Sequence, residues 1–285
     1  MSLFKNESGQ VRLVWRLILI ILLYTTVAVL LRFLPIRILT AYLVGDGITH
    51  AIALEKATEL IIQNPVWSTS LGLLFGLLGL LIVWVLITKV EKSTFRWKAV
   101  GLEWKHNSFL MILLGALIAL LIYFGYILTR RLVKPTEIAQ IPIRIGVSIP
   151  IFFHKLFLFL IMGFGEEIVF RGYIQTRGVK QLGATWGILL TAVIFVLLHQ
   201  IFYSLSLITI LSGMLLWFAI GLLFLFSKSL FLSITFHVVM NTLMNTLDLP
   251  YDDTDSLIMH AFLFFCVIVF GIITKKFQIL RRKNL

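Results

Sequence analysis

Apolar residues run along this chain in about eight long segments that are separated by short polar stretches. A helix needs about 20 mostly apolar residues to cross the hydrocarbon core of a bilayer. The pattern therefore predicts an all-α, polytopic integral membrane protein, built as a single transmembrane domain over residues 1–285. The predicted spans are 13–34, 66–87, 109–128, 150–178, 186–199, 205–226, 230–247 and 257–273.

Small residues and prolines refine this division. The second span carries Gly72-x-x-x-Gly76 and Gly79, a spacing that lets two helices approach closely. Residues 35–65 mix charged and apolar positions, so we expect an amphipathic segment outside the spans. Proline costs least between helices and at helix starts. The prolines at 35, 65, 135, 142, 150 and 250 are expected to occupy such places.

Composition agrees with a membrane protein. Hydrophobic residues make up 60% of the chain, charged residues only 13%, and the mean hydropathy is +1.02. Soluble globular proteins have about 25% charged residues, and disordered chains combine low hydrophobicity with high net charge. Both classes are therefore excluded. The single cysteine, Cys266, stands in an apolar run, so it forms no internal disulfide and is expected to be a small buried hydrophobe.

The net charge of +12 comes mainly from basic residues at the ends of the apolar segments. This placement is typical of cytoplasmic loops and of attraction to anionic lipid, and it argues against nucleic-acid binding. With an even number of spans, it predicts that both termini are cytoplasmic. The last basic group consists of Lys275, Lys276, Arg281, Arg282 and Lys283.

Two adjacent carboxyl groups, Glu166 and Glu167, stand inside the fourth predicted span. A charged side chain in the bilayer costs about 2.5–3.5 kcal/mol or more, so it needs a partner or a function. Glu167 and Arg171 are four residues apart, share a helix face and are expected to pair. Glu166 is turned about 100° away from Glu167, so it can point into a cavity.

Two further spans carry polar residues at helical spacing, in Phe195-x-x-x-His199 and His237-x-x-x-Asn241. The helical rise puts these residues and Glu166 at depths compatible with one polar cavity. A carboxylate and an imidazole that share a water molecule can act as a general base. An imidazole N–H and an amide can stabilise an oxyanion. These are the parts of a peptide hydrolase, and its substrate would be a membrane-embedded or lipid-attached peptide.

The ordered motifs resemble those of the CPBP family, which contains CAAX-type prenyl endopeptidases and the bacterial Abi proteins of bacteriocin processing and immunity. The resemblance covers residues 166–241 and includes the continuation Arg171-Gly172-Tyr173. A weaker similarity is Val100-Gly101-Leu102, ahead of the third span. The resemblance implies an all-α intramembrane endopeptidase with about eight spans around a conical cavity, and a catalytic core over residues 150–247.

The resemblance also implies roles for the motif residues. Glu166 and His199 activate water, His237 and Asn241 hold the oxyanion, and Glu167 and Arg171 support the site. Prenyl endopeptidases of this family use a glutamate without metal, so no cofactor is expected. Zinc held by Glu166, His199 and His237 stays open as an alternative.

Several hypotheses about the cellular role stay open at this point. The family implies a multi-pass protein of the bacterial plasma membrane, in contact with lipid and with a peptide or lipidated-peptide substrate. Its Abi members imply an alternative, a non-catalytic immunity or scaffold protein that binds a bacteriocin or a sensor kinase. A proton-coupled transporter is a third hypothesis, although the inverted repeats typical of transporters are missing. Substrate identity, cleavage position, and oligomeric state do not follow from the sequence.

Overall fold

The computed structural model describes residues 4, 11–133, 148–203, 205–247, 256–269 and 271. Every regular element within these residues is a helix, which confirms the all-α prediction. Among the described helices, five are long and apolar enough to cross a membrane, as expected of a polytopic membrane protein. They are Leu13–Gly45, Pro65–Val90, Ser108–Leu128, Ile149–Leu182 and Leu207–Ser227.

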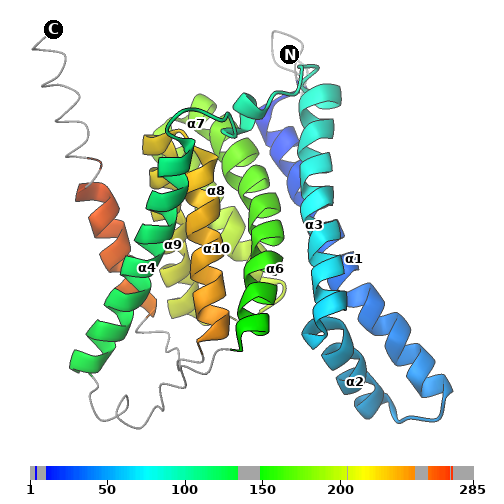
Figure 1. The fold of residues 1–285 in the computed structure, drawn as a ribbon. Helices are drawn as coiled ribbons and strands as arrows, with labels where there is room; N and C mark the ends of the chain where they lie inside the picture. The colour runs from blue at the N-terminus through cyan, green and yellow to red at the C-terminus, as the bar shows by residue number, and fades with distance from the viewer. Residues whose placement is uncertain are drawn as a thin grey trace, which may run out of the picture. The chain divides into compact units, whose positions relative to one another are not determined.

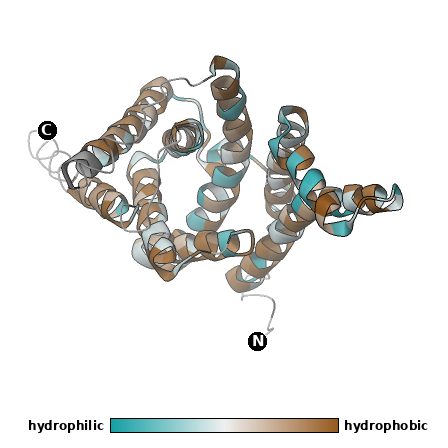
Figure 2. Cartoon of the chain, turned by 90° about the horizontal axis from the view of Figure 1, so that it is seen from below, coloured by the Kyte–Doolittle hydropathy of each residue, from teal (hydrophilic) through white to brown (hydrophobic). Residues whose placement is uncertain are grey.

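Shorter apolar helices cover the remaining predicted spans. They are Ala184–Gln200, Leu230–Thr246 and Ser256–Val269. The first two have 17 residues each and therefore rise about 26 Å, close to the roughly 30 Å of a bilayer's hydrocarbon core. Within the described residues, each of the eight predicted segments thus overlaps a helix. Most of the helical ribbon in Figure 2 carries the colour of hydrophobic residues, as expected where lipid rather than water surrounds the helices.

The first compact unit spans Met1–Arg96 and Val147–Val169. Within it, the first helix packs against the second and third, and the third packs along the helix that begins at Ile149 (Figure 1). Its elements are α1 (Leu13–Gly45), α2 (His50–Gln63), α3 (Pro65–Val85), the π-helical turn η1 (Leu86–Val90) and α6 (Ile149–Glu167).

Glycines allow α3 and α6 to pack closely. A Cβ atom built on Gly76 would lie 2.7 Å from the carbonyl oxygen of Ile161, and one built on Gly165 would lie 2.6 Å from the Cα atom of Gly76. Neither position leaves room for a side chain, so the predicted close approach of α3 to another helix is confirmed. The contact sets the residue before Glu166 against the backbone of α3.

The predicted end of the first span at residue 34 is wrong, because α1 continues through Pro35 to Gly45. Buried contacts beyond the proline offset the main-chain hydrogen bond that it removes. Ile36 forms a core cluster with Ala57 and Ile61 of α2. The predicted amphipathic segment therefore begins only at α2, whose buried residues recur every four positions at Ala53, Ala57 and Ile61.

Pro65 and the proline at 150 stand in the first turns of α3 and α6, as predicted. The prolines at 135, 142 and 250 lie outside the described residues. So does the basic group Lys275, Lys276, Arg281, Arg282 and Lys283. The cytoplasmic placement of both termini and the division into a single domain stay predictions.

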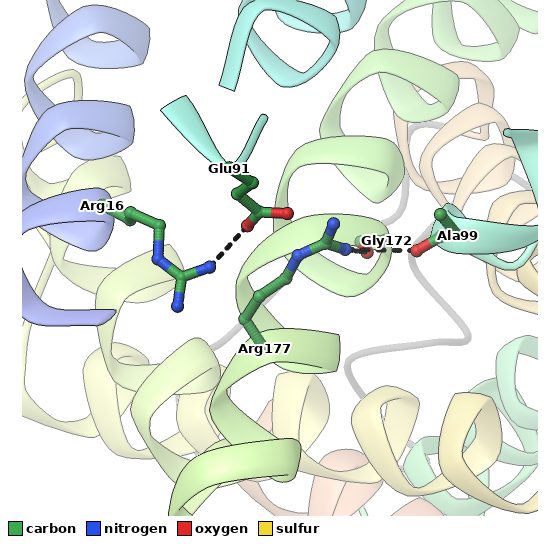
Figure 3. Close-up of polar contacts among 5 residues, drawn as sticks. All are labelled: Arg16, Glu91, Ala99, Gly172 and Arg177. Carbon is green, nitrogen blue, oxygen red and sulfur yellow. Dashed lines mark hydrogen bonds and ion pairs between the residues drawn. The ribbon is translucent and has the colours of Figure 1, made fainter. Parts of the chain in front are cut away.

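A shielded ion pair joins the start of α1 to the residue after η1. A guanidinium nitrogen of Arg16 donates to Oε1 of Glu91 at 2.7 Å, and the two side chains are only 11% and 14% exposed (Figure 3). We expect Glu91→Ala to lower the free energy of unfolding by about 1–3 kcal/mol, because the arginine loses a buried charged acceptor. Thermal unfolding in detergent measures this loss.

Glu103→Ala is the matched control for this prediction. Glu103 pairs with Lys98 at 3.6 Å and with Lys105 at 3.3 Å, but these side chains are exposed. Exposed pairs contribute about 0–1 kcal/mol, so this variant should unfold close to the wild-type temperature. Equal shifts for the two variants would contradict a stabilising role of the Arg16–Glu91 pair.

The second compact unit spans Trp97–Gly146 and Phe170–Leu285. In it, α4 packs along α10, and α8 packs against α7 and α9 (Figure 1). Its elements are the 3₁₀ turn η2 (Trp97–Val100), α4 (Ser108–Val133), α7 (Thr176–Leu182), α8 (Ala184–Gln200), α9 (Leu207–Ser227), α10 (Leu230–Thr246) and the helix Ser256–Val269.

The predicted burial of Cys266 is wrong, because this residue is exposed. The helix Ser256–Val269 buries Met259, Leu263 and Val267, one residue in every four, in the core of the second unit. Cys266 falls beside this stripe on the outer face, together with the exposed Phe262. In a bilayer such a face contacts lipid, so an apolar run alone does not place a residue in the protein core.

Candidate active site

The Glu-Glu-x-x-x-Arg motif lies where the fourth predicted helix changes its winding. The apolar helical segment Ile149–Leu182 is continuous, but α6 ends at Glu167 and the π-helix η3 (Ile168–Gln175) follows directly. In line with π-helical winding, Thr176 Oγ1 donates to the carbonyl oxygen of Arg171, five residues earlier, at 2.9 Å. π-Helical turns are rare and are often found at functional sites.

This winding changes the basis of one prediction. The expected pairing of Glu167 with Arg171 assumed the α-helical spacing that brings residues i and i+4 onto one face. That spacing ends at Glu167, because η3 begins at the next residue. The pairing therefore stays a prediction, and the π-helix itself gave no signal in the pattern of apolar residues.

The two glutamates occupy different environments at the end of α6, in the first unit. Glu167 is fully buried at 0% exposure, whereas Glu166 is half-buried. A phenol that sequence reasoning missed, Tyr24 of α1, is buried and interacts electrostatically with both carboxylates. Its ring packs on Phe75 of α3, with the centroids 5.0 Å apart. The more accessible Glu166 is the better placed of the two to meet a substrate.

In the second unit, aromatic and basic side chains gather around Phe195. We call this group the Phe195 cluster; it consists of Phe170, Arg171, Phe195, His199, Trp217 and His237. It contains every residue that defines the three motifs except Asn241 and the two glutamates. The cluster therefore joins η3, α8, α9 and α10.

His199 is held at the end of α8 in a defined orientation. Its ring stacks on Phe195 with the centroids 4.3 Å apart and an interplanar angle of 24°. Its Nδ1 atom lies 2.9 Å from the carbonyl oxygen of Phe195. A carbonyl oxygen only accepts, so the neutral ring carries its proton on Nδ1. Nε2 then keeps its lone pair and can accept a proton from water.

His237 of α10 lies against the same ring. Its centroid is 6.4 Å from that of Phe195 and 4.9 Å from that of Trp217, and it meets both rings edge-on at 70°. The side chain is buried. Asn241 stands one helical turn later on α10, on the same face as His237, and is half-buried. The structure thus brings both imidazoles against Phe195, with the amide one turn along.

Arg171 is buried in the same cluster, at 1% exposure. Its guanidinium carbon lies 4.4 Å from the ring centroid of Trp217 and 5.2 Å from that of Phe195. Both distances are within the range of cation–π attraction. Trp217 stands on α9, which carries none of the predicted motifs, so sequence reasoning missed it.

The segment Val100-Gly101-Leu102 has a structural role in this unit. Gly101 has a φ of +79°, and its carbonyl oxygen accepts from the main-chain N–H of Leu230 at the start of α10. A Cβ atom built on Gly172 of η3 would lie 3.0 Å from Cβ of Val100. The segment therefore supports η3 and α10 at once.

Arg177 of α7 strengthens this support. Its guanidinium donates to the carbonyl oxygens of Ala99 at 3.1 Å and Gly172 at 3.3 Å (Figure 3). It also lies 4.4 Å above the ring of Tyr173. The Arg171-Gly172-Tyr173 continuation is thus fixed to the segment before α4.

Within neither unit do the described residues include three or more His, Cys, Asp or Glu side chains grouped as metal ligands. The zinc alternative would combine Glu166 of the first unit with His199 and His237 of the second, so it stays a prediction. The sharing of one pocket by the glutamates, both histidines and Asn241 likewise stays a prediction.

Comparison with known proteins bears directly on the motif region. No curated protein and no solved structure matches the chain. Residues 148–243, about a third of the chain, match the family described as Rce1-like, type II CAAX prenyl endopeptidase. The matched segment contains all six predicted site residues. The resemblance read from the motifs is therefore confirmed, since residues 148–243 are similar to the Rce1-like family of type II CAAX prenyl endopeptidases.

Proposed function

We propose that this protein is an intramembrane endopeptidase that hydrolyses a peptide bond in a membrane-embedded or lipid-attached peptide. The observation that carries the proposal is the hydrogen bond between Nδ1 of His199 and the Phe195 carbonyl oxygen. It leaves Nε2 of a neutral imidazole ready to accept a hydrogen bond from water, within a segment that is similar to a family of endopeptidases.

In the proposed reaction, Glu166 and His199 activate one water molecule: Nε2 of His199 accepts a hydrogen bond from it, and Glu166 takes its other proton as the water oxygen attacks the carbonyl carbon of the scissile bond. The carbonyl oxygen becomes negatively charged, and it then accepts hydrogen bonds from an N–H of His237 and from the Asn241 amide. When the C–N bond breaks, the proton held by Glu166 passes to the leaving amine. The products are a free carboxyl end and a free amino end.

Burial separates the roles of the two carboxylates. The half-buried Glu166 can meet water and substrate, whereas the fully buried Glu167 cannot without rearrangement. Glu167 and Arg171 are therefore assigned to the support of the site. We place the protein in the bacterial plasma membrane with both termini cytoplasmic.

The membrane peptidomes of cells that carry wild-type or Glu166→Gln protein test this proposal. We expect peptides or protein termini that appear only with the wild-type protein, because only this protein cleaves. If the two peptidomes are the same while the Glu166→Gln protein still confers the cellular phenotype, a non-catalytic immunity or scaffold role accounts for the protein better.

We also propose that the reaction needs no metal, so removal of metal should leave cleavage unchanged. The steps above require only a carboxylate to carry the proton, and imidazoles and an amide to form hydrogen bonds. Purified protein treated with a zinc chelator and then freed of it should cleave peptide at the wild-type rate. Loss of cleavage that added zinc restores would instead establish the alternative in which Glu166, His199 and His237 hold zinc.

A further inference from the structure

Trp217 of α9 contacts residues from all three motif-bearing helical segments of the second unit. Its ring centroid lies 4.4 Å from the guanidinium carbon of Arg171 in η3. It lies 3.8 Å from the ring of Phe195 in α8 and 4.9 Å from that of His237 in α10. None of the residues named in the proposed mechanism belongs to α9. This helix meets the site through the aromatic side chain of Trp217.

These contacts have a definite chemistry. The face of an indole is negative and is the strongest aromatic partner of a cation. Arg171 is almost completely buried, and a buried charge without compensation is unstable. Trp217 therefore helps to keep the guanidinium in the core. The edge-on contact at 70° with His237 also limits how far that imidazole can rotate.

A second contact fixes the register between α9 and η3. Gln175 Nε2 donates to the carbonyl oxygen of Gly221 at 2.8 Å. The contact of Arg171 with Trp217 and the hydrogen bond of Gln175 to Gly221 therefore join the same two helices. The second contact lies four residues farther along each helix. A Cβ atom on Gly221 would lie 2.5 Å from Cγ2 of Ile188 in α8 and 3.0 Å from Oε1 of Gln175, so a side chain at this position would crowd both neighbouring elements. The placement of Trp217 is thus set by the packing of α9.

We infer that Trp217 is a positioning residue of the site, which holds Arg171 in the core and fixes the imidazole of His237 toward the developing oxyanion. The inference rests on the proposed endopeptidase function and extends it to α9. It assigns Trp217 no contact with the reacting atoms. Its effect should therefore fall on kcat, while substrate binding and KM stay close to those of the wild type.

The test replaces Trp217 in the full-length protein with tryptophans that carry an increasing number of fluorine atoms. Fluorine weakens the negative ring face and leaves the shape of the indole nearly unchanged. The substrate is a peptide that the comparison of membrane peptidomes identifies. Its cleavage should slow stepwise, by about tenfold in kcat over the series, with KM unchanged. A residue that only fills space would show no such trend.

Two variants and a control complete the experiment. Trp217→Phe keeps a weaker aromatic face and should retain more activity than Trp217→Leu, which removes it. The same fluorinated series at Trp186, an exposed residue at the start of α8, should leave kcat unchanged. Equal kcat across the series at position 217 would overturn the inference.

Failure of the proposed function is distinguishable from failure of this inference. Cleavage is first compared between wild-type and Glu166→Gln protein. Cleavage that does not depend on Glu166 overturns the proposed function and the inference with it. Cleavage that depends on Glu166 but not on fluorination at position 217 overturns the inference alone.

Discussion

Glu166→Gln should slow peptide cleavage by purified protein by about 10²–10⁴-fold, because a positioned general base contributes a factor of this size. Glutamine keeps the volume of the side chain and one acceptor oxygen, but it cannot take a proton from water. Glu166 is half-buried at the end of α6, so the substitution leaves the α3–α6 packing in place. The rates are measured with a substrate peptide that the comparison of membrane peptidomes identifies.

Glu59→Gln is the matched control, because Glu59 is an exposed residue of α2 outside the motif region. This variant should cleave at the wild-type rate, and both variants should insert into membranes and melt near the wild-type temperature. Full turnover by the Glu166→Gln protein would refute the assignment of Glu166 as the base.

Gly165→Ala should destabilise the first unit by about 1–3 kcal/mol, the usual range for overpacking a tight core. A Cβ atom at this position would lie 2.6 Å from Cα of Gly76, and a backbone atom cannot yield as a flexible side chain can. The helices must then separate, although alanine favours helix more than glycine does. Thermal unfolding in detergent measures the loss, and cleavage should also fall because Glu166 is the next residue.

The control for this prediction is Gly125→Ala in α4. A Cβ atom on Gly125 would meet nothing within 4 Å, so alanine should leave the unfolding temperature unchanged or raise it. If Gly165→Ala unfolds at the same temperature as Gly125→Ala, the close contact between Gly76 and Gly165 does not stabilise the unit.

Much of the fold follows from the sequence, because a bilayer permits so few structures. Lipid satisfies no backbone polar group, so a long apolar segment that enters the membrane forms a helix. The close approach at Gly72-x-x-x-Gly76 was also predictable, because small residues let two helices pack closely in a membrane. The extension of α1 beyond Pro35 was not, because it depends on the contact of Ile36 with α2. The exposure of Cys266 was missed because lipid, unlike water, accepts an apolar face.

The site was predictable as a set of residues but not as an arrangement. The carboxylates and histidines stood out because polar groups are costly in an apolar helix. Trp217 and Tyr24 did not stand out, since an aromatic residue in an apolar span is ordinary. The π-helix that begins at Ile168 has no periodic signature of its own. Tyr24 and Trp217 gain their roles only through contacts with helices that are distant in sequence.

Chemical cross-linking in native membranes tests most directly whether the acid and the imidazole come together. In a Cys266→Ser background, we expect a short bifunctional thiol reagent to bridge Glu166→Cys and His199→Cys. The control pair, Glu166→Cys with Trp186→Cys, should stay unbridged, because Trp186 lies about 20 Å along α8 from His199. If both cysteines of the first pair react singly but are never bridged, the carboxylate and the imidazole do not share a pocket, and the proposed mechanism is contradicted.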